Sequence, residues 1–91
     1  MAEKRYAGVW VKAVVLDKLF KRGCWGGRYT PLDSLVRWLG RRVRRNGGRV
    51  RRAVKQLVND GYLILHKRGK AVSLNPAKSR EVAEFIESTL S

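Results

Sequence analysis

A helix, its stop and the start of a strand follow one another within residues 50–63, which read VRRAVKQLVNDGYL. Apolar residues recur there at the spacing of one helical face, at Val50, Ala53, Val54, Leu57 and Val58. Gly61 is a residue type that commonly ends a helix, and strand-forming residues begin directly after it. We therefore expect a helix over residues 49–59, followed by a strand over residues 62–66.

The face of this helix opposite the apolar stripe would be polar. At about 100° per residue, it carries Arg49, Arg52, Gln56 and Asn59, with Lys55 beside them. Arginine pairs bidentately with guanine, and Gln or Asn pairs with adenine, in the DNA major groove. We predict that these five residues contact base edges and that Arg51, nearer the flank, contacts phosphate.

A hairpin is expected after the helix. Its second strand would cover residues 71–74, and Leu63, Leu65, Val72 and Leu74 would share one face of the two strands. The turn between them, Lys67-Arg68-Gly69-Lys70, is strongly basic. We predict that Lys67, Arg68 and Lys70 contact phosphates.

Two helices are expected before residue 49. The first covers residues 9–21, with its apolar stripe at Val9, Ala13, Leu16, Leu19 and Phe20. A glycine-rich loop over residues 23–27 ends it, and residues 28–29 are expected to form a short edge strand. Thr30 is expected to cap the second helix, with Pro31 in its first turn. That helix runs to about Arg45, or ends earlier at Gly40.

Basic residues are concentrated around the second and third helices. Residues 34–59 contain nine Lys and Arg and no Asp or Glu. Solvated helical faces ordinarily mix the two signs, so this excess favours a polyanionic partner. The amides of two glycines before the third helix add an anion site. The predicted phosphate contacts of this region are Arg37, Arg41, Arg44, Arg45, Gly47, Gly48 and Arg51.

The last helix is expected over residues 77–90, with Asn75-Pro76 at its start. Trp10 and Val14 lie on the side of the first helix opposite Leu16, and this second stripe must cover something. We expect either the last helix, through Phe85 and Ile86, or another subunit in a homodimer to meet it.

The whole composition agrees with a basic, non-catalytic protein. The 91 residues include 21 Lys and Arg against seven Asp and Glu, a formal net charge of +14. A single cysteine, Cys24, and a single histidine, His66, form neither a zinc site nor a convincing catalytic dyad. We expect one domain over residues 1–91, with its core within residues 9–75. We expect no enzyme activity, no cofactor, no metal, no membrane segment and a cytoplasmic, nucleoid-associated location.

This order of elements resembles the winged-helix (winged helix-turn-helix) family of DNA-binding domains. The resemblance is carried by residues 30–36 (TPLDSLV), 50–63 and 65–74 (LHKRGKAVSL). It implies an α+β, mostly helical fold with a three-helix core, a β-hairpin wing and a C-terminal helix. It also implies a transcription regulator or chromosome-associated protein that places helix 49–59 in the major groove of double-stranded DNA and wing 67–70 on the backbone. The basic stretch 40–48 departs from the shorter turn of many members.

Two other functions fit the same pattern. Some small-subunit ribosomal proteins of archaeal and eukaryotic type are similar in fold and charge, so an RNA-binding, ribosome-associated protein is the first alternative. A protein-interaction adaptor in a replication or transcription complex, using the stripe of Trp10 and Val14 or the acidic last helix, is the second. Membrane binding ranks last, because the basic faces lack an apolar surface that is free to insert.

Overall fold

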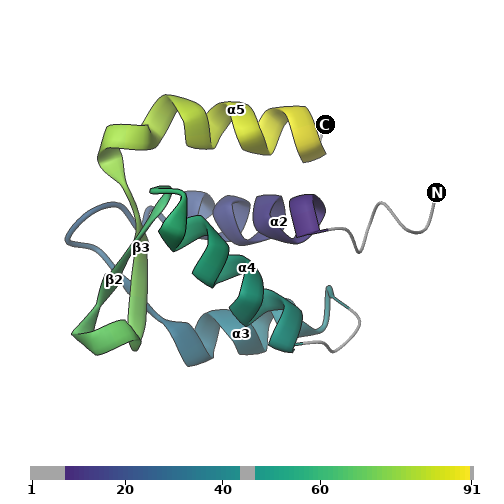
Figure 1. Cartoon of the computed structure of the whole chain (residues 1–91), viewed down its shortest axis with the longest axis vertical. Coiled ribbons are helices and arrows are strands. Elements are labelled where there is room, and N and C mark those ends of the chain that lie inside the picture. The colour runs from purple at the N-terminus through teal and green to yellow at the C-terminus, as the bar shows by residue number, and fades with distance from the viewer. Residues whose placement is uncertain (1–7, 44–46, 91) are drawn as a thin grey trace.

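The computed structural model describes residues 8–43 and 47–90, which form an α+β domain that is mostly helical. Along the chain they contain α2 (Gly8–Lys21), β1 (Thr30–Pro31), α3 (Leu32–Gly40), α4 (Gly47–Asn59), β2 (Leu63–His66), β3 (Ala71–Leu74) and α5 (Ser79–Leu90). Two short 3-10 helices, η1 (Lys67–Gly69) and η2 (Pro76–Lys78), flank β3. In Figure 1, α5 and α2 run alongside one another, α4 crosses between α2 and α3, and the strands stand at one end of the helices.

The core is built around α2, which is buried on almost every side. Six of its residues are buried: Val11, Ala13, Val14, Val15, Leu16 and Leu19. Contacts with α4 and with α5 cover this helix from two directions. The first of the two predicted stripes was therefore wrong at its two ends, because the side chains of Val9 and Phe20 are 56% and 43% exposed.

The expected partner surface on α2 also needs correction. Val14 is completely buried in the core, so it offers no surface to another subunit. Trp10, Phe85 and Ile86 are half-buried and pack against the same core. Of the two occupants expected for this stripe, the last helix is the one that packs on α2.

The sheet differs from expectation at its first strand. Its order is β1-β3-β2, and all pairs are antiparallel. The strand predicted at residues 28–29 lies instead at Thr30–Pro31, where Thr30 pairs with Val72. Thr30 is consequently not the cap of α3: its side chain is buried, and its Oγ1 lies 2.8 Å from the Sγ of Cys24. Pro31 occupies the cap position without a side-chain hydrogen bond.

Helix α3 has the shorter of its two expected lengths, and α4 begins earlier than expected. α3 ends at Gly40, and α4 begins at Gly47, so the two glycines predicted in a turn form the first turn of α4. Gly47 is also tightly packed, because a Cβ placed on it would lie 2.9 Å from Cγ1 of Val36 on α3. A close approach of the two helices therefore requires a residue without a side chain at position 47.

The connection into α5 is capped as predicted. The side-chain oxygen of Asn75 accepts a hydrogen bond from the backbone N–H of Ala77 at 3.0 Å. Its amide nitrogen donates to the carbonyl of Gly61 at 2.9 Å, so one side chain joins the end of α4 to the start of α5. The helix itself begins at Ser79, two residues later than predicted, because η2 precedes it.

Candidate nucleic-acid interface

Helix α4 packs on its neighbours along one side and exposes the other side along its whole length. Its buried residues are Val50, Ala53, Val54 and Leu57, and they contact α2, α3 and β2. Its exposed residues are Gly48, Arg51, Arg52, Lys55, Gln56 and Asn59. The exposed side is a ridge with a hollow on each flank, and the predicted contact residues are divided between the two flanks.

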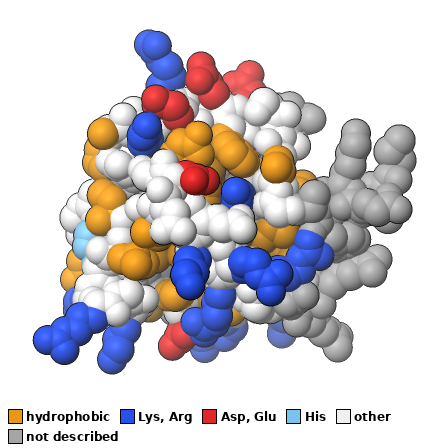
Figure 2. Space-filling view, viewed as in Figure 1, with side chains coloured by type: hydrophobic (Ala, Val, Ile, Leu, Met, Phe, Trp, Pro, Cys, Tyr) orange, Lys and Arg blue, Asp and Glu red, His pale blue; other side chains and the backbone are white. Residues whose placement is uncertain are grey.

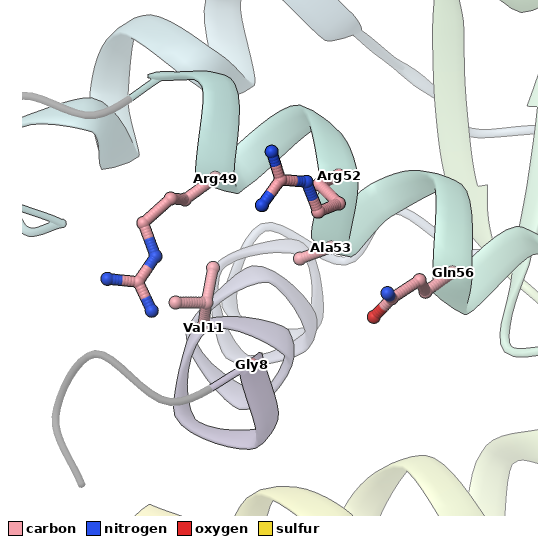
Figure 3. A pocket seen from close by; sticks show the side chains of 6 residues that line it. All are labelled: Gly8, Val11, Arg49, Arg52, Ala53 and Gln56. Atoms are coloured by element: carbon pink, nitrogen blue, oxygen red, sulfur yellow. The ribbon is translucent and has the colours of Figure 1, made fainter. Parts of the chain in front are cut away.

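The first hollow lies between α4 and the start of α2. Gly8 and Val11 of α2 line it together with Arg49, Arg52, Ala53 and Gln56 of α4, and its volume is about 140 Å³. Figure 3 shows the side chains of Arg49, Arg52 and Gln56 projecting from α4 on the side where α2 lies. Arg49 is half-buried, so this residue points less fully outward than the helical spacing predicted. We call this region the α2-side hollow.

The second hollow lies between α4 and the hairpin that β2, η1 and β3 form. Its polar lining comes from α4, with Arg51, Lys55 and Asn59, and its volume is about 380 Å³. The other lining residues are Leu32, Val54, Val58, Leu65 and Gly69. We call this region the hairpin-side groove. The predicted base-contact residues Lys55 and Asn59 thus lie on the opposite flank of α4 from Gln56.

Leu65 lies on the predicted face of the hairpin but is more exposed than its partner on that face. It shares a face with Val72, as predicted, and the two residues pair across β2 and β3. Val72 is completely buried, whereas the side chain of Leu65 is 45% exposed. The difference arises because β3 is the central strand and β2 is an edge strand, with Leu65 close to the turn. An alternating pattern shows on which face of a strand a residue lies, but it does not show whether other elements cover that residue.

The hairpin tip, residues 67–70, presents three exposed basic side chains, those of Lys67, Arg68 and Lys70. Lys67 and Arg68 both adopt left-handed backbone conformations, with φ of 51° and 57°, which is uncommon for residues other than glycine. The ammonium of Lys67 lies 5.5 Å from the centre of the Tyr29 ring. That ring stacks on His66 with 4.6 Å between ring centres, so an aromatic pair supports the base of the tip.

The tip is also tied to the start of α3. The backbone N–H of Leu32 donates to the carbonyl of Lys70 at 2.8 Å, and the N–H of Lys70 donates to the carbonyl of Lys67 at 3.2 Å. These hydrogen bonds hold the tip beside the residues that begin α3. The basic side chains of the tip therefore stand at a defined position relative to α4.

The remaining predicted phosphate contacts divide into four cases. Arg37 on α3 and Arg41 just after it are exposed. Arg51 is exposed but pairs with Asp33, with 2.9 Å between Nη2 and Oδ1. Arg44 and Arg45 lie outside the described residues. Gly47 and Gly48 form the first turn of α4, which contains no acidic residue.

Some basic residues have a structural role elsewhere on the molecule. The guanidinium of Arg22 lies 4.2 Å from the centre of the Trp38 ring, and the ammonium of Lys18 lies 5.3 Å from it. Arg42 lies over Trp10, at 6.0 Å from the ring centre. These cation–π contacts give the three cations partners within the protein itself.

Charge is distributed unevenly over the surface. Helix α5 carries Glu81, Glu84 and Glu87, which are three of the seven acidic residues of the chain, and only one of its 21 basic residues. Figure 2 shows acidic side chains grouped over α5, whereas the blue Lys and Arg side chains gather over the hairpin and over the ends of α3 and α4. A polyanion is therefore attracted to the side of the molecule opposite α5.

The lone cysteine and histidine have local partners in the fold. Cys24 is buried against Thr30, and Nε2 of His66 lies 2.8 Å from Oγ of Ser73. Within residues 8–43 and 47–90, no three His, Cys, Asp or Glu side chains are close enough together to hold a metal ion. No helix in the described part of the chain is both long and apolar enough to cross a membrane.

Comparisons of this chain with protein-family models, with curated proteins and with solved structures find no match.

Proposed function

We propose that this chain is a winged-helix domain that binds double-stranded DNA. In this proposal α4 is the recognition helix and enters the major groove, and the hairpin is the wing, whose tip lies on the backbone. In this proposal both flanks of α4 contact the DNA, with Arg52 on the side of the α2-side hollow and Lys55 on the side of the hairpin-side groove.

The observation that carries the proposal is the position of the exposed cations. Arg51, Arg52 and Lys55 are exposed on α4, and the three basic residues of the hairpin tip are exposed around Gly69, which lines the hairpin-side groove, while acidic residues concentrate on α5. Such a surface costs stability through repulsion between like charges, and a bound phosphate backbone relieves that repulsion. A helix is also the element whose dimensions fit the major groove.

The test is an electrophoretic titration of a short DNA duplex at several salt concentrations. With about six phosphate contacts, the plot of log K against log salt has a slope of about −5, so the affinity falls about 10³-fold from about 50 to 200 mM salt. The double variant Arg52→Ala and Lys55→Ala removes two cations of α4, each of which displaces counterions from the DNA that it approaches. We expect it to reduce the slope by about 2. Both substitutions favour the helix, so the fold is retained.

The matched control is the double variant Lys78→Ala and Arg80→Ala. It removes the same charge from residues on the η2 and α5 side of the molecule. We expect its slope to equal that of the unsubstituted protein. Equal slopes for the two double variants would refute α4 as the DNA-contacting element. Tighter binding of a structured RNA than of duplex DNA at matched salt would instead support the ribosome-associated alternative.

A further inference from the structure

We propose that the hairpin-side groove holds one sugar–phosphate strand and that its apolar lining selects deoxyribose over ribose. This inference rests on the proposed function, because it assumes that α4 and the hairpin tip contact a duplex. It adds a substrate preference, DNA over RNA, and assigns that preference to the side chain of Leu65.

The first argument is the order of chemical groups across the groove. Arg51 and Lys55 stand on the α4 wall, and the far wall ends at Gly69, within the basic hairpin tip. The floor between the α4 wall and Gly69 is apolar and is made by Leu32, Val58 and Leu65 with part of Val54, while the polar side chain of Asn59 belongs to the α4 wall. In Figure 2, hydrophobic side chains are exposed between the hairpin and the basic side chains over α4. Cations on the α4 wall beside an apolar floor match a strand whose phosphates alternate with sugars.

The second argument is the geometry of a duplex. An element in the major groove and a second element beside it, over the adjacent groove, are separated by one backbone strand. With α4 and the hairpin tip in those two places, the space between them is the hairpin-side groove. The sugars of that strand then lie against the exposed part of Leu65.

The third argument is the cost of burying a hydroxyl. The lining residues supplied by α3 and the hairpin, which are Leu32, Leu65 and Gly69, have no polar side-chain atom. A ribose 2′-hydroxyl placed against Leu65, away from the polar side chains of the α4 wall, loses water and gains no hydrogen bond, which weakens binding by about 5- to 150-fold. Deoxyribose carries only a methylene at that position and is accepted. The 2′-hydroxyl is the group by which proteins distinguish RNA from DNA at a given site.

The experiment compares three short duplexes of one sequence. The first is DNA throughout, the second has a ribonucleotide at regular positions in both strands, and the third has a 2′-fluoro nucleotide at those same positions. Fluorine favours the sugar pucker of ribose but has no O–H, so it separates the hydroxyl from the shape of the sugar. We expect the protein to bind the ribonucleotide duplex at least about 5-fold more weakly than the fluoro duplex.

The variant Leu65→Thr supplies a hydroxyl partner at an exposed strand position where threonine is well tolerated. We expect it to reduce the difference between the two duplexes to less than about 2-fold. The control Val9→Thr changes an exposed apolar residue of α2 that lines neither hollow, and it should discriminate as the unsubstituted protein does.

The outcomes separate the two proposals. Equal binding of the ribonucleotide and fluoro duplexes, with normal binding of DNA, overturns the deoxyribose inference and leaves the proposed function intact. Unchanged discrimination in Leu65→Thr overturns the assignment to this groove. Failure to bind any of the three duplexes overturns the proposed function and this inference together.

Discussion

The contact between α3 and α4 at Gly47 makes a strong prediction about stability. A Cβ at position 47 would lie 2.9 Å from Cγ1 of Val36. Carbon atoms in van der Waals contact are about 3.5–4.0 Å apart, so Gly47→Ala forces a displacement of roughly 0.6–1.1 Å. The helices must separate or Val36 must leave its rotamer, because the interior is close-packed.

The expected loss of stability is the cost of overpacking minus the gain from replacing a helical glycine by alanine. Overpacking of a close-packed contact costs about 1–3 kcal/mol. Replacing glycine by alanine in a helix returns about 0.5–1 kcal/mol, because glycine loses more backbone entropy on folding. The net loss for Gly47→Ala is therefore centred on about 1.3 kcal/mol, with an upper limit of about 2.5 kcal/mol, and the central value corresponds to a fall in Tm of roughly 5–10 °C in a domain of this size.

Thermal and chemical denaturation followed by circular dichroism measures this loss, and Gly8→Ala is the matched control. Gly8 is likewise the first residue of a helix, and a Cβ there would meet nothing within 4 Å, so that variant should be neutral or slightly stabilised. Val36→Ala removes the clashing methyl group. Combining it with Gly47→Ala should give a double variant more stable than the sum of the single effects, with a coupling of about 0.5–3 kcal/mol. Additive effects, or equal stability of the two glycine variants, would refute the close approach.

Two further predictions concern Asn75 and Asp33. Asn75→Ala removes the cap of the α5 connection and the bond to Gly61, and we expect a loss of about 1–3 kcal/mol in urea denaturation, whereas a loss below about 0.5 kcal/mol would contradict both bonds. Asp33→Asn releases Arg51 from an exposed ion pair, so stability should change by less than about 1 kcal/mol while the affinity for DNA rises. Titration of duplex DNA at low salt measures that rise, and an unchanged or weaker affinity would contradict a contact between Arg51 and phosphate.

The sequence predicts α4 and the hairpin well because their signals are local. Apolar spacing along 13 consecutive residues defines α4, and the hydrogen bonds of the hairpin join residues close in sequence. Thr30 shows the opposite case. Its strand partner is Val72, far along the chain, and nothing in the neighbouring residues distinguishes a strand ending in Pro31 from a helix cap. Local rules therefore assign Thr30 to α3, and tertiary pairing overrides them.

The sequence predicts which residues of α4 are exposed, but it does not predict how the neighbouring elements are arranged around them. Helical spacing distinguishes the exposed side of α4 from its buried side, so Arg52, Lys55 and Asn59 were predicted correctly as exposed. It does not show that α2 and the hairpin flank that side and divide its residues between two hollows. The two covered sides of α2 were expected from its two apolar stripes, and α4 and α5 are the helices that cover it. The spacing did not show that Val9 and Phe20, at the two ends of the first stripe, lie beyond this cover.

The concentration of acidic residues on α5 affects the orientation of the molecule while it diffuses. Opposite charges separated across a body with a longest extent of 37 Å create a permanent electric dipole. In the field around a nucleic acid, that dipole experiences a torque that turns α5 toward bulk water during diffusion. If the chain binds DNA as proposed, collisions in the productive orientation should become more frequent at low ionic strength, and the outer surface of α5 should face solvent in the complex.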